Sequence, residues 1–281
     1  MKRTGLALLA LLMIAAAGCG DSPTGGKPAI QTDPVTVQNA LPTTVGSTWT
    51  YALAGRVYAD SINPANVYDT EGEVPGGLDL EAVVALAANH PRPTPLQLDN
   101  GTLDWSLDFA VPSGDTLGCF FGSMEDWPTR ANYVYFGPGA DQLWIGPDWL
   151  GYPPGGASTR FPLLEGGLQA GDTFTQNLGG DLALSVRVIG ESTVSTPAGV
   201  FANALACFYY VDYGVVGVQD PQGGPEIVGY MRGLDYGTMY WVAGVGPVRV
   251  TYRSGMSIGD DGVDAGLREI TVTLTSASAL D

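Results

Sequence analysis

Apolar and polar residues alternate along much of the chain, in short runs that glycine and proline interrupt. From Leu103 to Val111 the odd positions are large and apolar, while the even positions are small or acidic. The stretch from Leu182 to Val188 alternates in the same way. A period of two places one face of a strand in a core and the other in water. Because forty glycines and twenty prolines separate such runs, the pattern predicts antiparallel strands and an all-β fold.

The order of these runs predicts two hairpins. Residues 196–199, Thr-Pro-Ala-Gly, have the composition of a tight turn, and Val200–Tyr213 runs back from it. Near the C-terminus, Val248–Arg253 and Glu269–Leu274 alternate and predict a second pair of strands. We therefore expect a curved antiparallel sheet, arranged as an open β-barrel or a sandwich.

Two further local patterns stand out. Asp79 is a suitable N-cap for a short helix over Leu80–Ala88, which ends before His90 and Pro91. Val45–Tyr51 and Ala170–Gln176 each place a turn glycine before an aromatic residue that stands between two threonines. This echo either marks the starts of two halves of a curved sheet or is a chance similarity of two strand openings.

The N-terminus has the organisation of an export signal. Lys2 and Arg3 precede an apolar run from Leu6 to Ala17, which as a helix is about 18 Å long and too short for a hydrocarbon core of about 30 Å. Residues 16–19, Ala-Ala-Gly-Cys, resemble the lipobox of bacterial lipoproteins, with alanine at the position where leucine is commonest. The resemblance implies removal of residues 1–18 and acylation of Cys19, as in palmitate-bearing lipoproteins. The alternative is an ordinary secretory signal with a chance cysteine.

The rest of the chain divides into a tether and one domain. Residues 19–40 have little apolar content and predict a flexible tether. Residues 41–281 predict a single β domain with an aromatic-rich insertion at about 58–160, which holds the short helix. Gly20 after the acylated cysteine favours the outer membrane or the periplasmic face of the envelope over the inner membrane.

Charge limits the partners of this chain. Removing the signal leaves ten basic residues against twenty-nine acidic ones, a formal charge of −19. Nucleic acid is a poor partner, because binding to phosphates needs clustered Lys and Arg. An anionic membrane surface is disfavoured for the same reason. We expect the membrane to be a partner only through the N-terminal lipid.

Three motifs carry a resemblance to known proteins. Residues 46–51, 194–201 and 241–248 are similar to the G-x-x-W-x-Y, T-P-A-G-x-F and W-x-A-x-G-V-G-x-V motifs of uncharacterised secreted or lipid-anchored bacterial proteins. The resemblance covers the first strand and the chain from about residue 171. It implies a curved antiparallel sheet, similar to the open barrel of periplasmic lipoprotein carriers, with no established activity and no catalytic residues to transfer.

The catalytic patterns in the sequence are weak. Ser257 stands in a G-x-S-x-G pattern, but we interpret that stretch as a glycine-rich loop, and the lone histidine, His90, lies upstream. Asp104 and Asp108 share a strand face, where a hydrated acidic stripe is the alternative to a glycosidase pair. The residue spacing predicts no zinc site and no cofactor. Enzymatic activity is the less favoured interpretation.

Several residues are candidates for binding or structural roles. Cys119 and Cys207 form a disulfide in an oxidising compartment or are two buried thiols. Aspartates 260, 261 and 264 supply oxygen ligands for a weak calcium candidate, with a solvated loop as the alternative. Arg249 and Arg253 share a strand face, and they either hold an anionic ligand or form a cross-strand ion pair with Glu269 on the other side of the hairpin.

The aromatic side chains of the insertion are the candidate ligand-binding residues. They are Trp127, Tyr133, Tyr135, Trp144, Trp149 and Tyr152. Such rings either stack against a glycan or another amphiphile, or form the insertion's own core. We expect a non-enzymatic, lipid-anchored envelope protein that binds a ligand or an envelope-protein partner. The alternatives are a structural or assembly lipoprotein and a hydrolase that uses acidic residues or Ser257.

Overall fold

The structure is a computed structural model, and it describes most of the chain. The described residues are 29–58, 63–89, 94–110, 117–121, 133–138, 141–146, 161–179, 182–219, 226–259, 262–263 and 268–280. The predicted signal, residues 1–18, and Cys19 lie outside them. None of the described helices is long and apolar enough to cross a membrane.

The described residues form one antiparallel sheet with a single α-helix, so the expected all-β class is confirmed. The strands of the main path are, in chain order, β2 (Thr48–Val57), β3 (Gln97–Ala110), β4 (Leu117–Phe121), β5 (Tyr133–Pro138), β6 (Gln142–Gly146), β7 (Phe161–Glu165), β8 (Thr173–Gly179), β9 (Leu182–Thr196), β10 (Gly199–Gln219), β11 (Ile227–Val242), β12 (Gly246–Gly259) and β14 (Arg268–Ala277). The short elements are β1 (Ala29–Ile30), β13 (Gly262–Val263), α2 (Leu80–Asn89) and the 3-10 turns η1 (Pro64–Asn66), η2 (Glu71–Glu73) and η4 (Ser278–Leu280).

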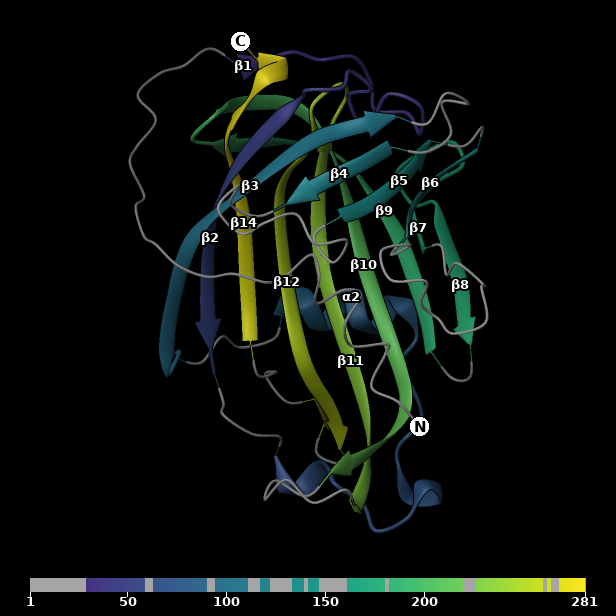
Figure 1. The fold of residues 1–281 in the computed structure, drawn as a ribbon. Helices are drawn as coiled ribbons and strands as arrows, with labels where there is room; N and C mark the ends of the chain where they lie inside the picture. The colour runs from purple at the N-terminus through teal and green to yellow at the C-terminus, as the bar shows by residue number, and fades with distance from the viewer. Residues whose placement is uncertain are drawn as a thin grey trace.

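The sheet is curled and not closed. Its spatial order is β7-β6-β5-β4-β3-β2-β14-β12-β11-β10-β9-β8, with β1 beside β10 and β13 beside β12. Figure 1 shows β3 and β4 crossing in front of β10, β11 and β12, with α2 behind those long strands. The curled sheet therefore has a concave inner face and an outer face that α2 partly covers.

The main core lies inside the curl. Leu107 from β3 and Leu274 from β14 are fully buried there with Trp241 from β11. Two side chains inside this core form a chain of hydrogen bonds: Trp241 Nε1 donates to the Tyr209 hydroxyl at 3.1 Å, which donates to the Leu163 carbonyl at 2.6 Å. Since Leu163 is on β7 and Tyr209 on β10, this chain of bonds connects two parts of the sheet that are distant along its path.

A smaller core lies on the outer face, under α2. Val83 of the helix is fully buried in a cluster with Phe208, Tyr210 and Leu234 of the sheet. The helix begins as the sequence predicts, because Asp79 Oδ1 accepts a hydrogen bond from Ala82 N at 2.7 Å. It extends one residue beyond the predicted span.

The predicted hairpins are confirmed. Thr196 pairs with Gly199 across the turn between β9 and β10, and its Oγ1 accepts from Gly199 N at 3.3 Å. At the C-terminal end, β12 pairs with β14, and Val250 lies opposite Val272. The alternation predicted for β3 is also present, because Leu103, Trp105 and Leu107 are buried while Asp104 is exposed.

The sequence echo corresponds to a repeated piece of backbone. Gly46 and Gly171 have φ angles of 92° and 94°, which an L side chain rarely adopts. Gly46 N donates to the Leu107 carbonyl on β3 at 2.8 Å, and Gly171 N donates to the Val188 carbonyl on β9 at 2.8 Å. Each glycine therefore attaches the start of its strand, β2 or β8, to the next strand.

Two expected boundaries can be compared with the described residues. Part of the expected tether is ordered, since β1 pairs in parallel with β10 and Val35, Val37 and Ala40 are buried in the main core. The ordered structure thus starts earlier than Leu41. The segment expected as an insertion supplies α2 and β3 to β6, and these strands extend the same sheet. Among its described side chains, Leu103, Leu107 and Leu143 are part of the common core.

Candidate functional site

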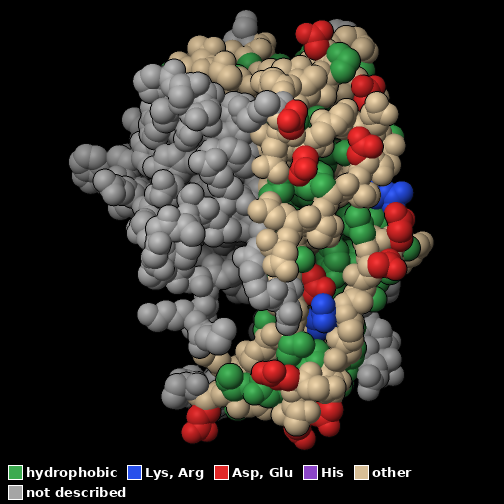
Figure 2. Space-filling model, turned by 90° about the vertical axis from the view of Figure 1, so that its right-hand side faces the viewer, with side chains coloured by type: hydrophobic (Ala, Val, Ile, Leu, Met, Phe, Trp, Pro, Cys, Tyr) green, Lys and Arg blue, Asp and Glu red, His purple; other side chains and the backbone are tan. Residues whose placement is uncertain are grey.

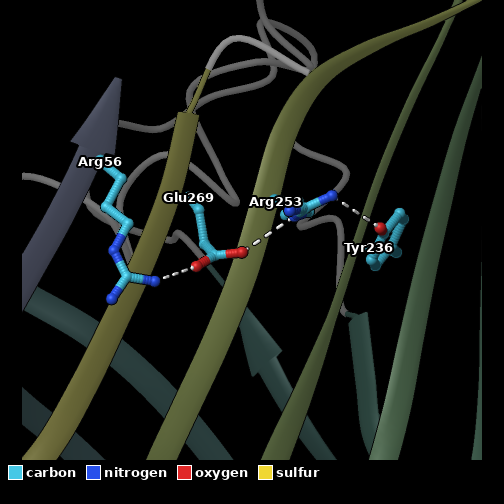
Figure 3. A network of polar contacts seen from close by, with 4 residues as sticks. All are labelled: Arg56, Tyr236, Arg253 and Glu269. Atoms are coloured by element: carbon cyan, nitrogen blue, oxygen red, sulfur yellow. Dashed lines mark hydrogen bonds and ion pairs between the residues drawn. The ribbon is translucent and has the colours of Figure 1, made fainter. Parts of the chain in front are cut away.

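A row of polar side chains crosses four neighbouring strands on the outer face. Arg56 on β2 lies directly opposite Glu269 on β14, Glu269 lies opposite Arg253 on β12, and Arg253 lies opposite Tyr236 on β11. We call these four residues the arginine–glutamate row (Figure 3). Directly opposite residues in an antiparallel sheet have Cβ atoms close enough for side-chain pairing, so strand register alone brings these groups together.

Glu269 is shared between the two arginines. Its Oε1 accepts from Arg56 Nη1 at 2.9 Å, and its Oε2 accepts from Arg253 Nε at 2.9 Å. Arg253 Nη1 also donates to the Tyr236 hydroxyl at 3.5 Å. Each arginine therefore gives Glu269 one N–H group, and neither makes the two-pronged contact that a guanidinium can form with a carboxylate.

The row is buried at its centre and open at one end. Glu269 is 2% exposed and Arg253 is 3% exposed, whereas the Arg56 side chain is 45% exposed. Burial alone lowers the pKa of the Arg253 guanidinium, but its hydrogen bonds to Glu269 and Tyr236 raise that pKa above the ordinary value. Burial and a hydrogen bond to Glu269 act in the same opposed way on the pKa of Arg56, which is also raised. Both arginines are therefore charged, and the row has one positive charge in excess.

Tyr58, just beyond the end of β2, lies against Arg253. The Arg253 guanidinium carbon lies 5.6 Å from the centre of the Tyr58 ring, within the range of a cation–π contact. Tyr58 also lies near Arg56 and contributes to the raised pKa of that guanidinium. Arg253 Nη2 is buried and has no hydrogen-bond partner among the described residues. One donor of the row is thus left unsatisfied beneath Tyr58.

The segment that follows continues across the outer face. Asn66 of η1 donates from Nδ2 to Ser257 Oγ at 2.8 Å. Further along, Gly77 lies against the ion pair of Arg232 and Asp212, whose Nη2–Oδ2 distance is 2.8 Å. A Cβ at Gly77 would lie 2.5 Å from Arg232 Nη2, so a larger residue there would displace the side chains of this ion pair.

A second polar cluster lies on the other face of the same strands. Tyr252 and Arg253 are neighbours in β12 and project to opposite faces. The Tyr252 hydroxyl donates to Asp235 Oδ2, as does the Tyr213 hydroxyl at 2.5 Å, and Gly255 N donates to Asp235 Oδ1 at 2.8 Å. Burial raises the pKa of Asp235, and these three hydrogen bonds oppose the rise without cancelling it.

The predicted catalytic candidates occupy structural positions where they are described. The G-x-S-x-G stretch, interpreted from the sequence as a loop, lies inside β12, so that interpretation is wrong. Ser257 is 1% exposed and bonded to Asn66, and it is not on the strand-to-helix turn that a nucleophile elbow needs. Asp104 is exposed and accepts from Thr50 Oγ1 at 2.8 Å. The side chain of Asp108 is outside the described part.

Of the two alternatives for the arginines, the cross-strand ion pair is confirmed. Arg253 pairs with Glu269 across β12 and β14, as the cross-strand alternative proposed. Arg249 does not join it, because its Nη2 donates to the Ser195 carbonyl at 2.8 Å. Among the described residues, no group of three or more His, Cys, Asp or Glu side chains is arranged to hold a metal ion.

Cys207 is a free thiol in the main core. Burial raises its pKa to about 12, although a hydrogen bond with Tyr209 acts in the opposite direction. Cys207 therefore agrees with the buried-thiol alternative. Cys119 lies on β4, where its backbone pairs with Leu107 and Val134, but its side chain is outside the described part.

The remaining sequence candidates lie outside what the structure describes. Trp127, Trp149, Tyr152 and His90 belong to segments that are not described, as do the calcium candidates Asp260, Asp261 and Asp264. The backbone of Tyr133 and Tyr135 forms part of β5, and that of Trp144 forms part of β6, but their side chains are not described. The aromatic binding surface therefore stays a prediction.

Several residues in and beside the two polar clusters were not identified from the sequence. Arg56 and Tyr58 were not singled out, because no pattern in the sequence indicates that β14 pairs with β2. Asp235 was not singled out either, because its partners Tyr213 and Tyr252 lie on two other strands. The available signal was an arginine or aspartate inside a strand-like apolar run, where a buried charge requires a partner.

Comparisons with known proteins give distant structural similarity alone. No family model matches the chain, and no curated protein matches it. A solved structure named as a lipoprotein of Parabacteroides distasonis ATCC 8503 is similar at 12% identity and a TM-score of 0.38, over 86% of this chain and 99% of that one. An exported protein with a YmcC-like fold from Bacteroides fragilis NCTC 9343 is similar at 13% identity and a TM-score of 0.38, over 85% of this chain and 98% of that one.

Proposed function

We propose that this chain is an exported envelope protein, attached to a membrane by lipid on Cys19. The support is the order of charged, apolar and small residues that precedes Cys19. Mass spectrometry of the protein from bacterial membranes tests this proposal. We expect an N-terminus at Cys19 with the mass of added acyl chains, and a Cys19→Ser variant that lacks them. An intact Met1, or an unmodified thiol at residue 19, would overturn the proposed lipid attachment.

We further propose that the β domain is a non-enzymatic binding module. The arginine–glutamate row is the observation that favours binding, because it brings an excess positive charge to the surface at the half-exposed Arg56. The surrounding protein is strongly acidic, and Figure 2 shows acidic side chains spread over the described part of one face with few basic ones. A positive group maintained in such surroundings favours a role in recognition.

The binding proposal includes the aromatic segment as a contact surface for a glycan or another amphiphile. We expect saturable binding that quenches tryptophan fluorescence, and loss of that binding in Trp144→Ala and Trp149→Ala. A matched control is Trp105→Phe, because Trp105 is buried in the main core. Unchanged binding in both alanine variants would show that the surface is elsewhere.

A structural or assembly role is the second candidate, and the open sheet favours it. On the main path β8 pairs with β9, and β7 pairs with β6, so each is an end strand of the described sheet. End strands can add a strand from another chain. A photo-crosslinker at Thr175 on β8, used in intact cells, should then capture one envelope protein reproducibly. The same crosslinker at buried Val186 should capture none.

A further inference from the structure

We propose that the arginine–glutamate row is a binding site for a carboxylate group, which Arg56 and Arg253 hold beside Tyr58. This inference rests on the proposed binding function and names the chemistry of its ligand. The site lies on the outer face of the sheet, away from the main core, and its ligand is an organic acid or a carboxylate-bearing part of a larger molecule.

The hydrogen-bond donors of the row exceed its acceptors. Glu269 has two oxygens, and each is used by one N–H group from a different arginine. Arg253 keeps Nη2, which is buried without an acceptor. A buried donor without an acceptor costs free energy, and an oxygen placed beside Nη2 would remove that cost. Within the described part of the chain, the row therefore lacks an acceptor at a defined atom.

The charge of the row matches a single carboxylate. Arg56 and Arg253 contribute two positive charges and Glu269 one negative charge. One ligand carboxylate would neutralise the remainder, and guanidinium groups bind planar carboxylates through parallel N–H groups. Tyr58 covers the face of the Arg253 guanidinium, so the edge of that group is the part left for a ligand.

Arg56 and Tyr58 provide the entry to the site. The Arg56 side chain is 45% exposed and can meet a ligand in solution. The Tyr58 hydroxyl lies near Arg56 and contributes to its raised pKa, and a carboxylate oxygen can take that position instead. Displacing that hydroxyl would bring the ligand toward Arg253 Nη2. Tyr58 thus competes with the ligand for Arg56.

Titration of the ¹⁵N-labelled mature chain with sodium acetate and sodium succinate at constant ionic strength tests the site. We expect saturable shifts of the Nε–H resonances of Arg56 and Arg253. Binding should weaken about tenfold or more in Arg56→Gln and strengthen in Tyr58→Phe. Arg268→Gln is the matched control, because Arg268 precedes Glu269, is exposed, and projects to the opposite face of β14.

Each outcome decides the proposal. Equal acetate binding by the wild type and Arg56→Gln would overturn the site, as would equal weakening in Arg268→Gln. Saturable binding of inorganic phosphate in place of both carboxylates would overturn the ligand class. Failure of the broader binding function is separately visible, since glycan binding and the modification of Cys19 do not depend on Arg56. Arg56→Gln should unfold at a temperature close to that of the wild type. A loss of binding in this variant is then not caused by a loss of folding.

Discussion

Glu269 on β14 lies directly opposite Arg253 on β12 and accepts a hydrogen bond from its Nε at 2.9 Å, with both side chains buried. The sequence predicts a cross-strand ion pair here, but one that contributes only modestly to stability. Burial changes its energetics, because removing one partner leaves the other charge in a poorly solvated place. The same burial that makes the row a candidate site also makes it a structural requirement.

Glu269→Gln should therefore destabilise the protein strongly. The variant keeps the shape of the side chain but leaves Arg253 without a buried counter-charge, which typically costs about 3–5 kcal/mol. Urea unfolding followed by tryptophan fluorescence measures the loss. Arg268→Gln, at the exposed neighbouring position, should change the free energy of unfolding by less than about 0.5 kcal/mol. A loss below about 1 kcal/mol for Glu269→Gln would contradict the importance of the buried pair.

Gly237→Ala should disrupt the pairing of β11 with β12. Gly237 lies opposite Tyr252, and a Cβ there would come within 2.3 Å of the Thr251 carbonyl oxygen. Backbone cannot move away as a flexible side chain can, so we expect a loss of about 3 kcal/mol or more, at the upper end for overpacked sites. Gly76→Ala is the control, since a Cβ at Gly76 meets nothing within 4 Å. Similar urea midpoints for the two variants would be inconsistent with the close approach.

The class of fold was predictable because alternation is a local property of the sequence. The runs at Leu103–Val111 and Leu182–Val188 each indicate a strand with one buried face, whatever its neighbours are. The turn at residues 196–199 and the cap at Asp79 depend on a few adjacent residues as well. Those predictions are confirmed for the same reason, since the physics that produces them acts within a few residues.

The composition of the sites was only partly predictable, because it depends on which strands pair. Arg253 and Glu269 were identified since one hairpin contains both. Arg56 is 213 residues from Glu269 along the chain, and no local pattern connects them. Asp235 meets its tyrosines where the register shifts between Leu234 and Tyr236, and irregular pairing of this kind has no signal in an alternating run.

Asp235 should make stability depend on pH. Its pKa is raised in the folded protein, mainly by burial, so the folded state binds this proton more tightly than the unfolded state does. The resulting stabilisation is complete below the unfolded value of about 3.9 and is lost as the pH rises through the raised folded value. Relative to Asp235→Asn, the wild type should thus lose free energy of unfolding as the pH rises above about 4. Asp104→Asn, at an exposed position, should retain the wild-type slope, and equal slopes for all three proteins would exclude this assignment.

Cys207 should be unreactive while the protein is folded. Burial raises the pKa of its thiol to about 12, so almost no thiolate is present at pH 8. In a chain with Cys19→Ser and Cys119→Ser, iodoacetamide should add no mass under native conditions and one carbamidomethyl group in urea. Rapid native modification would show that the thiol is accessible. The double substitution is needed so that the measured mass reports on Cys207 alone.

Asn203 should determine where the N-terminal segment leaves the domain. Asn203 Oδ1 accepts from Thr32 N at 3.2 Å and from Thr32 Oγ1 at 3.1 Å, and Asn203 Nδ2 donates to the Thr32 carbonyl at 2.5 Å. These bonds secure the chain just after β1. The expected lipid at Cys19 precedes Ala29 by ten residues, which span at most about 35 Å when extended. This attachment therefore limits which end of the sheet can approach the membrane.

Asn203→Ala should release this segment without unfolding the sheet. Each lost hydrogen bond contributes about 0.5–1.5 kcal/mol, so the amide of Thr32 should exchange with solvent at least about fivefold faster. Asn39→Ala is the control, because the Asn39 side chain forms hydrogen bonds within its own loop, with Thr36 N and the Pro34 carbonyl. Exchange at Thr32 that is equally fast in the control, or unchanged in Asn203→Ala, would mean that the buried residues Val35 and Val37 secure the segment by themselves.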